Sequence, residues 1–421
     1  FTPFARAVLD LYPLPSSNVS TGNNYFTTLS DVSDNNQGMA RLDHRFNDRF
    51  NLFFRYSIFD GMEAAPSPII QGGRSTEVRT HNMAFNLITV FSPKLLNELR
   101  LGYNRPVYLI LQQGAFQTDY ARNLGLSNLL TDPVGWGVPQ INPTGFSGIG
   151  SDSNPTTQVS NVYQLVNHFS FTGSSHSVKF GADMRKTNYN DRSERNVRGT
   201  FGFTGAMTSD PARASTTGVS IADLLLGLPL TATGSNTSLA GNFNGFSYAF
   251  FAQDDWRVSK RLTLNAGVRY DLNTRYTDVQ NRLTVFDGTV TGGRLLIAGS
   301  SKAFVPGRGV IDGPATPRGL IGTDTNNWAP RVGFAIRPFG TGRTVVRGGY
   351  GIFFETVELQ DLRTFVRNPP FGAVTDVRSD PNANSSSPAV LRIGELFPAT
   401  GSLSARPSAF SPTFDYPDPN Y

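Results

Sequence analysis

Hydrophobic and polar residues alternate one by one over several short stretches of this chain. In residues 262–272, apolar side chains occupy every second position, and polar residues such as Asn265 and Asp271 lie between them. Successive side chains of a β-strand point to opposite faces, so this pattern predicts a strand with one apolar and one polar face. The same pattern occurs at 49–59, 95–105, 178–188, 328–336 and 344–354.

The joins between the predicted strands are of two lengths, which alternate along the chain. Short joins occur at 46–49, 92–94, 173–176, 258–261 and 339–343. Long joins rich in Gly, Asn, Ser, Thr and Pro are expected at 60–79, 106–158, 191–244 and 276–325, before a tail that starts at Thr356. Short turns at one end and long loops at the other are typical of an outer-membrane β-barrel. We therefore predict an all-β, antiparallel transmembrane barrel segment with about ten strands in five hairpins, short periplasmic turns and long extracellular loops.

The alternation of a single strand does not distinguish a membrane from water. A soluble sheet with one solvated face gives the same pattern. The series favours a membrane, because each stretch is close to the ~9–11 residues that span a bilayer as a tilted strand. Tyr and Phe near the strand ends also suit an interfacial aromatic girdle. These residues are Phe91, Tyr103, Phe171, Tyr189, Tyr270, Phe353 and Phe354.

Three parts are predicted along the chain: an irregular lead-in or loop at 1–36, barrel strands and extracellular loops at 37–355, and a long loop or truncated tail at 356–421. Residues 220–228 have helical apolar spacing. This predicts a short helix in an outer loop, stopped by Gly227 and Pro229, or else a strand-edge fragment. Residues 133–155 are expected to form an ordered cap or a ligand-contacting loop, and 368–421 to be loop.

Composition narrows the classes of protein further. The hydrophobic share is 38%, and no apolar run approaches the ~20 residues of a membrane helix. The chain has no cysteine, so disulfides and thiolate metal sites are excluded. The net charge of +5 comes from 37 scattered basic and 32 acidic residues, which argues against a nucleic-acid partner. The absence of an initiator Met and the prolines near the end are interpreted as cuts through a longer protein.

No catalytic, cofactor or metal site is predicted. The serine-hydrolase, zinc-protease and P-loop motifs are absent, and the four histidines, His44, His81, His168 and His176, lack metal-ligand spacing. Residues 31–36 contain oxygen ligands suited to Ca²⁺ but lack the Gly and Glu of an EF-hand loop, so a polar turn is expected. Asp254 and Asp255 face opposite sides of a strand, which indicates structural ion pairs rather than a carboxylate dyad. An enzyme is therefore the weakest hypothesis.

Six arginines are the candidate functional residues, because they share the polar side of the alternation. We expect them to face the lumen. There they could hold a plug by ion pairs or steer anionic solutes; the alternative is that they solvate the lumen and neutralise nearby carboxylates. They are Arg55, Arg100, Arg185, Arg269, Arg331 and Arg347.

Two segments resemble barrel hairpins of TonB-dependent outer-membrane receptors. They are SYAFFAQDDWRVSKRLTLNAGVRYD at 247–271 and NWAPRVGFAIRPFGTGRTVVRGGYGIFFE at 327–355. The likeness is greatest to the Oar-like group, which carries a carboxypeptidase-regulatory-like domain before its plug. Weaker support comes from LYPLP at 11–15, Asn24 with Tyr25, RLDHRFNDRFNLFFRY at 41–56 and ADLLLGLP at 222–229.

The resemblance implies a 22-stranded barrel with a plug in its lumen. This chain matches only the middle of such a barrel, because no plug, TonB box, regulatory-like domain or closing strand is recognisable. Ten strands can close as a small barrel, but an incomplete segment of a larger one is favoured. The implied partners are outer-membrane lipid, the plug and remaining strands, the TonB complex through that plug, and an unknown extracellular ligand.

The leading functional hypothesis is TonB-dependent uptake of a bulky solute, whether a glycan, a peptide or a chelate. A structural or adhesive outer-membrane barrel whose loops bind partners is the alternative. A secreted, soluble β-rich binding protein is the third possibility.

Overall fold

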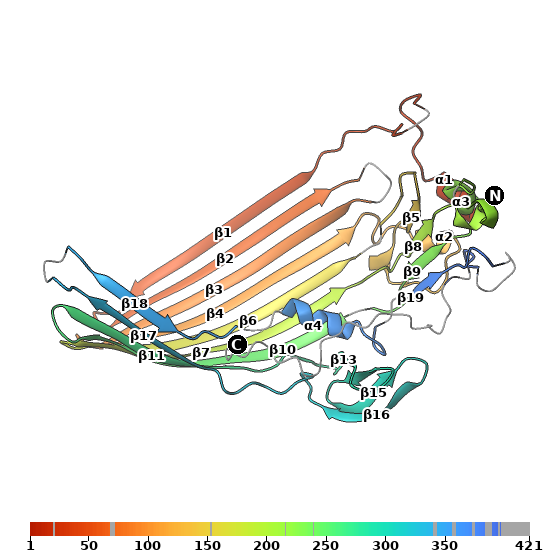
Figure 1. Ribbon diagram of the computed structural model, residues 1–421. Helices are drawn as coiled ribbons and strands as arrows, with labels where there is room; N and C mark the ends of the chain where they lie inside the picture. The colour runs from red at the N-terminus through yellow and green to blue at the C-terminus, as the bar shows by residue number, and fades with distance from the viewer. Residues whose placement is uncertain are drawn as a thin grey trace.

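The chain folds around one long antiparallel sheet, in which sequence neighbours are also spatial neighbours (Figure 1). The computed structural model describes residues 1–19, 22–67, 72–151, 154–214, 216–238, 240–339, 343–355, 359–372, 375–383, 390–394 and 396. The sheet order is β1 (Val32–Arg45), β2 (Phe50–Ala65), β3 (Arg74–Ser92), β4 (Leu95–Gln112), β6 (Thr156–Thr172), β7 (His176–Ser193), β10 (Ala240–Arg257), β11 (Leu262–Asn273), β17 (Trp328–Ile336) and β18 (Val346–Gly351). A short strand, β12 (Thr277–Asp278), also pairs with β10. The predicted meander of ten strands is confirmed.

The register gives the sheet one apolar and one polar face, because directly paired residues point to the same side. Phe54 lies opposite Phe85, which lies opposite Leu101, and Leu101 lies opposite Leu165. Large apolar side chains on this face are exposed, among them Met83, Leu101, Phe180, Phe250, Val268, Val332 and Tyr350. An apolar band that continues from strand to strand requires a non-aqueous environment such as lipid.

The short turns lie at one end of the sheet, and three of them close in the same way. Asn47 Oδ1 accepts hydrogen bonds from the backbone N–H groups of Arg49 and Phe50, at 2.8 and 3.0 Å. In the same manner, the Oγ atoms of Ser92 and Ser259 each accept hydrogen bonds from the backbone N–H groups of the second and third residues that follow. Asn and Ser favour such turns because their short side chains replace a backbone acceptor.

The long joins lie at the opposite end, as predicted, but the first is shorter than expected. Strands β2 and β3 stay paired from Phe50 with Thr89 to Ala65 with Arg74. The join expected at 60–79 is therefore reduced to residues 66–73, because the alternation continues through polar residues that periodicity alone assigned to a loop. The join between β17 and β18 covers 337–345, of which 340–342 lie outside the described residues.

The remaining long joins form two small packed units instead of irregular loops. The first contains a four-stranded sheet in the order β19 (Thr375–Arg378), β9 (Thr231–Gly234), β8 (Thr200–Phe203) and β5 (Gln140–Pro143). Around it lie α1 (Pro3–Leu9), α2 (Tyr120–Asn123), α3 (Ser220–Leu226) and three 3-10 turns, η1 (Pro133–Gly135), η2 (Ala206–Thr208) and η3 (Pro211–Arg213). Its core includes Val8, Ile141, Phe201 and Leu224, all fully buried. We call this group of elements the outer unit.

The second unit is formed by the join between β11 and β17 together with α4 (Leu359–Val366). Its antiparallel sheet has the order β13 (Thr284–Asp287), β14 (Arg294–Ile297), β15 (Ser300–Val305) and β16 (Gly309–Thr316). Leu283, Val285, Ala303 and Phe365 pack in its core with Phe243 of β10. We call these elements the inner unit, because Phe243 attaches them to the polar face of the long sheet.

Several sequence expectations are resolved by these units. The helix expected at 220–228 is α3, and Gly227 ends it with φ of 68°, a left-handed conformation that suits glycine. Residues 133–155 are ordered where described, with Val134, Val138 and Ile149 buried. The helix α4 and the strand β19 were not expected, because both lie in the stretch from residue 356 that was predicted to be loop or tail. Residues 397–421, including the proline-rich end, and Thr356 lie outside the described residues.

The division of the chain into three parts, with boundaries at residues 36 and 355, stays a prediction. The structure shows regular elements within the first of these parts. Residues 1–36, expected to be irregular, contain α1 and the beginning of β1 at Val32. The turn expected at 31–36 is wrong, because these residues are paired with β2 from Val32 onward. Among the described residues, no helix combines the length and apolarity needed to cross a membrane.

A glycine on the polar face provides a test of the register. A Cβ added to Gly181 would lie 2.3 Å from the carbonyl oxygen of Asn167 and 2.6 Å from Cβ of His168. We expect Gly181→Ala to lower the free energy of unfolding by ~1–3 kcal/mol, as overpacking does. Urea titration of the protein in lipid vesicles, followed by tryptophan fluorescence, measures this loss.

The control is Gly102→Ala on the same face of β4, where the nearest atom would lie 3.6 Å from the new Cβ. This variant should unfold at the wild-type urea concentration. An equal decrease in the free energy of unfolding in both variants would show that the close approach of β6 to Gly181 is not the cause of the destabilisation.

Candidate functional site

The six arginines singled out in the sequence lie on one face of the long sheet. Arg185 lies opposite Gln164, which lies opposite Gly102, two residues from Arg100. Arg331 lies opposite Gly267, two residues from Arg269. Arg55 and Arg347 join the same face through Ala84 and Ala335. That this face lines a lumen stays a prediction.

The arginines differ in their partners. Arg100 Nε donates to Glu98 Oε1 at 2.6 Å, and Arg269 Nε donates to Asp271 Oδ1 at 2.9 Å. Arg55 donates to the Asn82 amide oxygen at 3.3 Å, and its buried Nε has no partner in the described part of the chain. Arg100 and Arg269 therefore neutralise nearby carboxylates, whereas the other four arginines form no ion pair with a carboxylate of the described residues.

Besides Arg55, three of the arginines make no ion pair with a carboxylate of the described residues: Arg185, Arg331 and Arg347. The guanidinium of Arg331 instead lies 4.4 Å from the ring centroid of Phe353, a cation–π contact that leaves its hydrogen-bond donors available. These three side chains provide positive charge on the polar face without a fixed acidic partner.

A hollow on this face lies between β10, β11 and β17. It has a volume of about 440 Å³ and is lined by charged side chains including Lys179, Asp255, Arg269 and Arg331. Gly267 and Gly333 contribute no side chains to it, which opens the space. A smaller hollow of about 220 Å³ adjoins it beside Arg185 and Asp183. Both have charges of both signs, so together they suit a polar ligand or a polar segment of protein.

The inner unit covers the same face nearer the extracellular end. Tyr189 lies opposite Phe243, and it is four residues from Arg185 on β7, so it points to the polar side. Its ring packs on Phe243 with centroids 6.1 Å apart. The expectation that Tyr189 belongs to an aromatic girdle is wrong, because it packs against the inner unit instead. Figure 1 shows α4 in front of β10, and Phe365 of this helix shares a core with Phe243.

Asp278 attaches the inner unit to β10. Its carboxylate accepts hydrogen bonds from the backbone N–H of Asn242 at 2.8 Å and from the Arg282 guanidinium at 3.0 Å. Burial alone would raise the pKa of Asp278, but the hydrogen bonds from Arg282 and the backbone outweigh it and lower the pKa. Asp278 is thus held as a buried anion that fixes the loop to the strand.

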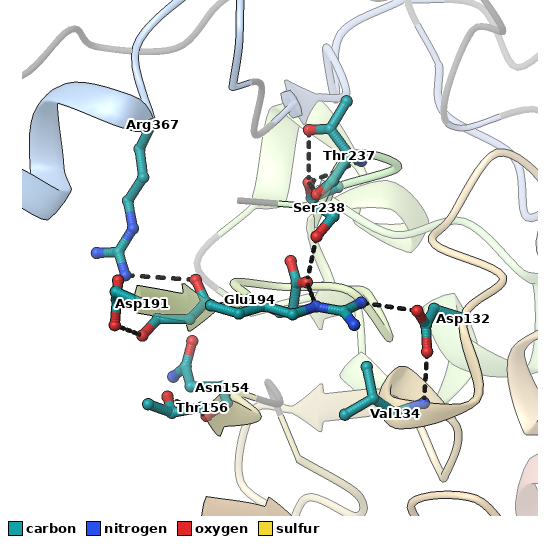
Figure 2. Close-up of polar contacts among 12 residues, drawn as sticks. Asp132, Val134, Asn154, Thr156, Asp191, Glu194, Thr237, Ser238 and Arg367 are labelled. Carbon is teal, nitrogen blue, oxygen red and sulfur yellow. Dashed lines mark hydrogen bonds and ion pairs between the residues drawn. The ribbon is translucent and has the colours of Figure 1, made fainter. Parts of the chain in front are cut away.

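Arg192, at the end of β7, attaches the outer unit in a comparable way. Figure 2 labels its two acidic partners, Asp132 and Glu194. Its guanidinium contacts Asp132 at 2.7 Å and Glu194 at 2.6 Å. Ser238 Oγ also donates to Glu194 at 2.7 Å, and Asp132 caps η1 through the N–H of Val134. Arg192 and Glu194 together therefore connect the end of β7 to two other stretches of chain, one at Asp132 and one at Ser238.

A second arginine is buried inside the outer unit. The side chain of Arg198 is only 1% exposed, and it donates to the backbone carbonyl groups of Gly135 and Trp136. Gly137 passes directly over the guanidinium, at a distance where a Cβ would overlap it. Sequence reasoning missed Arg192, Arg198 and Asp278, because each has a partner more than thirty residues away and no local motif marks it.

The remaining candidates have structural contacts. Asp254 and Asp255 point to opposite faces, as predicted: Asp254 pairs with His176 at 2.6 Å, and Asp255 accepts from Asn265 at 2.5 Å. His168 contacts Glu98 at 2.9 Å, and His81 contacts Tyr56 at 2.8 Å. In the described ranges, no three His, Asp or Glu side chains gather as metal ligands would.

Comparison with known proteins identifies relatives. A family model described as an outer membrane beta barrel domain matches residues 1–421. Over 109 residues the chain is 28% identical to the TonB-dependent transporter Oar of Myxococcus xanthus, and this match covers 26% of the chain and 7% of that protein.

Two solved structures are similar at low identity. The copper transporter OprC has a TM-score of 0.41 and 11% identity, with 77% of this chain and 37% of OprC covered. The ferric preacinetobactin receptor BauA of Acinetobacter baumannii has a TM-score of 0.34 and 12% identity, with 73% and 45% covered. The chain thus spans less than half the length of each of these two proteins.

The attachment at Arg192 generates a test of the outer unit. In Arg192→Gln, Glu194 loses its guanidinium partner while its side chain is 1% exposed. We expect the join at 113–155 to be cut several times faster by trypsin added to intact cells, because local opening becomes easier. Arg213→Gln is the control, since its ion pair with Asp210 is exposed at the surface. The control should be cut at the wild-type rate; equal acceleration in both would contradict the role of Arg192.

The same ion pair predicts a pH dependence. Hydrogen bonding from Arg192 holds the pKa of Asp132 below its ordinary value of about 4. The stabilisation it contributes is therefore complete above pH ~4 and is lost as the pH falls through the lowered folded-state pKa. Acid treatment below pH 4 should speed cleavage by an acid-active protease in wild type more than in Arg192→Gln. An identical pH profile in the two proteins would exclude Asp132 as the titrating group.

Proposed function

Because the chain belongs to the outer membrane β-barrel domain family, we propose that it forms the wall and extracellular loops of a TonB-dependent transporter for a bulky solute. The protein lies in the outer membrane of a Gram-negative bacterium. The observation that supports transport is the polar face with its arginines. This face lies on the side of the sheet opposite the apolar face, and the inner unit covers its extracellular end.

The edges of the long sheet support further barrel strands. β1 pairs with β2 alone, and β18 pairs with β17 alone, among the described residues. An unpaired strand edge in lipid leaves backbone N–H and C=O groups without partners, at several kcal/mol for each group. In this proposal, additional strands of a larger barrel satisfy both edges.

The polar face supports a plug or a passing solute. Arg185, Arg331 and Arg347 have no carboxylate partner in the described chain, and the hollow beside two of them is lined by both signs of charge. A plug domain in the lumen would provide acidic partners, and the TonB complex would move that plug. The inner unit, above the same face, would then be the first surface that a solute meets.

The test compares what the bacterium removes from its medium. Wild type, a strain without this protein and a strain without TonB are grown on a mixed extract of glycans, peptides and metal chelates. Mass spectrometry of the spent medium should show at least one solute that wild type consumes and both deletion strains leave. If every solute left by the strain without this protein is still consumed without TonB, TonB-dependent uptake by this protein is contradicted.

The adhesive alternative has a distinct outcome in the same strains. It rests on the two packed units, the outer and the inner, which present ordered surfaces to the outside. It predicts that medium consumption is unchanged without this protein, that attachment to surfaces falls, and that removal of TonB leaves attachment intact.

The unpaired arginines give the sharpest test by mutation. We expect Arg185→Gln together with Arg331→Gln to slow uptake about tenfold, since a hydrogen bond to a charged group contributes ~1.5 kcal/mol or more. Stability should be unchanged, because neither side chain makes an ion pair within the described chain. Arg257→Gln, on the same face near the short turns, is the control. Unchanged uptake in the double variant would favour simple solvation of the lumen.

A further inference from the structure

A shallow groove crosses the apolar face of the sheet over β4, β6, β7 and β10. It has a volume of about 450 Å³, and its lining includes Leu101, Tyr163, Met184, Phe246, Tyr248 and Lys186. All six point to the side opposite the arginines, because Tyr163 lies opposite Lys186 and Lys186 lies opposite Phe246. The groove therefore opens toward the lipid.

Lys186 is a charge in an otherwise apolar band. Below it on the same face of β7, the side chains are Met184, Ala182, Phe180 and Val178. The next ionisable side chain below is His176, which contacts Asp254 at 2.6 Å and stacks on Trp256 at 5.5 Å between ring centroids. These three residues mark the periplasmic boundary of the band.

Lys186 lies at the opposite, extracellular boundary of the apolar band. It lies ten residues beyond His176, which is about 33 Å along a strand and about 25 Å along the normal for a strand tilted near 40°. The apolar band of outer-membrane barrels is also ≈25 Å tall. Tyr103, Tyr163 and Tyr248 surround this level, as aromatic residues do at a lipid–water interface.

Lys186 also has no carboxylate partner in the described part of the chain. Its Nζ lies 5.7 Å from the Phe246 ring centroid, and its side chain is exposed. By contrast, Arg79, which is also on the outer face, pairs with Asp60 at 2.6 Å. A second cation, Arg105 on β4, likewise has no ion pair among the described residues and lies two residues above Tyr103.

We infer that this groove binds a phosphorylated, acylated glycolipid of the outer leaflet. An acyl chain lies along Leu101, Met184 and Phe246, and a head-group phosphate meets Lys186, with Arg105 as a second contact. The combination of an apolar groove and an unpaired ammonium group at the interface fits an anionic lipid better than a zwitterionic one. The inference depends on the outer-membrane location and on neither plug nor transport.

The test measures lipid binding to the protein extracted from outer membranes and delipidated in detergent. Native mass spectrometry is used with three probes: bis-phosphorylated lipid A, the same lipid with its phosphates removed, and phosphatidylcholine. We expect wild type to prefer the bis-phosphorylated lipid. Lys186→Gln should weaken that binding about fivefold, the ratio given by ~1 kcal/mol for one interfacial Lys.

Lys179→Gln is the matched control, because Lys179 is on the same strand but faces the polar side. It should bind as wild type does. Lys186→Arg should restore binding, which separates loss of charge from a folding defect, and the folded state of each variant is checked by its migration in unheated gels.

Two outcomes would overturn the inference. Equal weakening by Lys186→Gln and Lys179→Gln would show that position on the lipid face is irrelevant. Equal binding of the phosphorylated and dephosphorylated lipids would leave the groove as ordinary lipid contact.

Discussion

Backbone hydrogen bonding in a medium without water is the constraint on which this structure depends. Inside a bilayer each strand must pair on both sides, which favours long, uninterrupted antiparallel ladders such as the sixteen paired positions of β2 and β3. Pairing in fixed register then determines the faces, because paired residues share a side. The apolar surface, the row of arginines and the groove with Lys186 are consequences of that one register.

The two packed units show that long loops need not be irregular. Their cores are formed by side chains from joins that are distant in sequence, such as Leu283 with Phe365 and Ile141 with Leu224. Each is attached to a strand end by a buried or half-buried charge, Asp278 for the inner unit and Arg192 for the outer unit. The charges fix positions that loop backbone alone would leave variable, since loops pay a large entropy cost for order.

The sequence predicted what depends on local period and missed what depends on distant contact. Alternation over residues 262–272 and 178–188 located the strands and the polar side, and helical spacing with Gly227 located α3. The paired stretch around Asp60 and Arg79 was assigned to a loop, because its residues are polar on both faces. Arg192 and Tyr189 have no local signal at all: their roles come from Asp132 and Phe243, which lie more than fifty residues away. The six arginines were grouped correctly by face, whereas the difference between paired Arg269 and unpaired Arg331 required coordinates.

The shared core of the inner unit has an evolutionary consequence. Its sheet is encoded by the join between β11 and β17, and its helix by the segment after β18, yet Phe365 and Leu283 are buried in one core. Exchange of either segment alone between related proteins would expose apolar surface or create a cavity. The heritable module at this face is therefore a pair of discontinuous segments, and recombination that preserves folding must transfer both together.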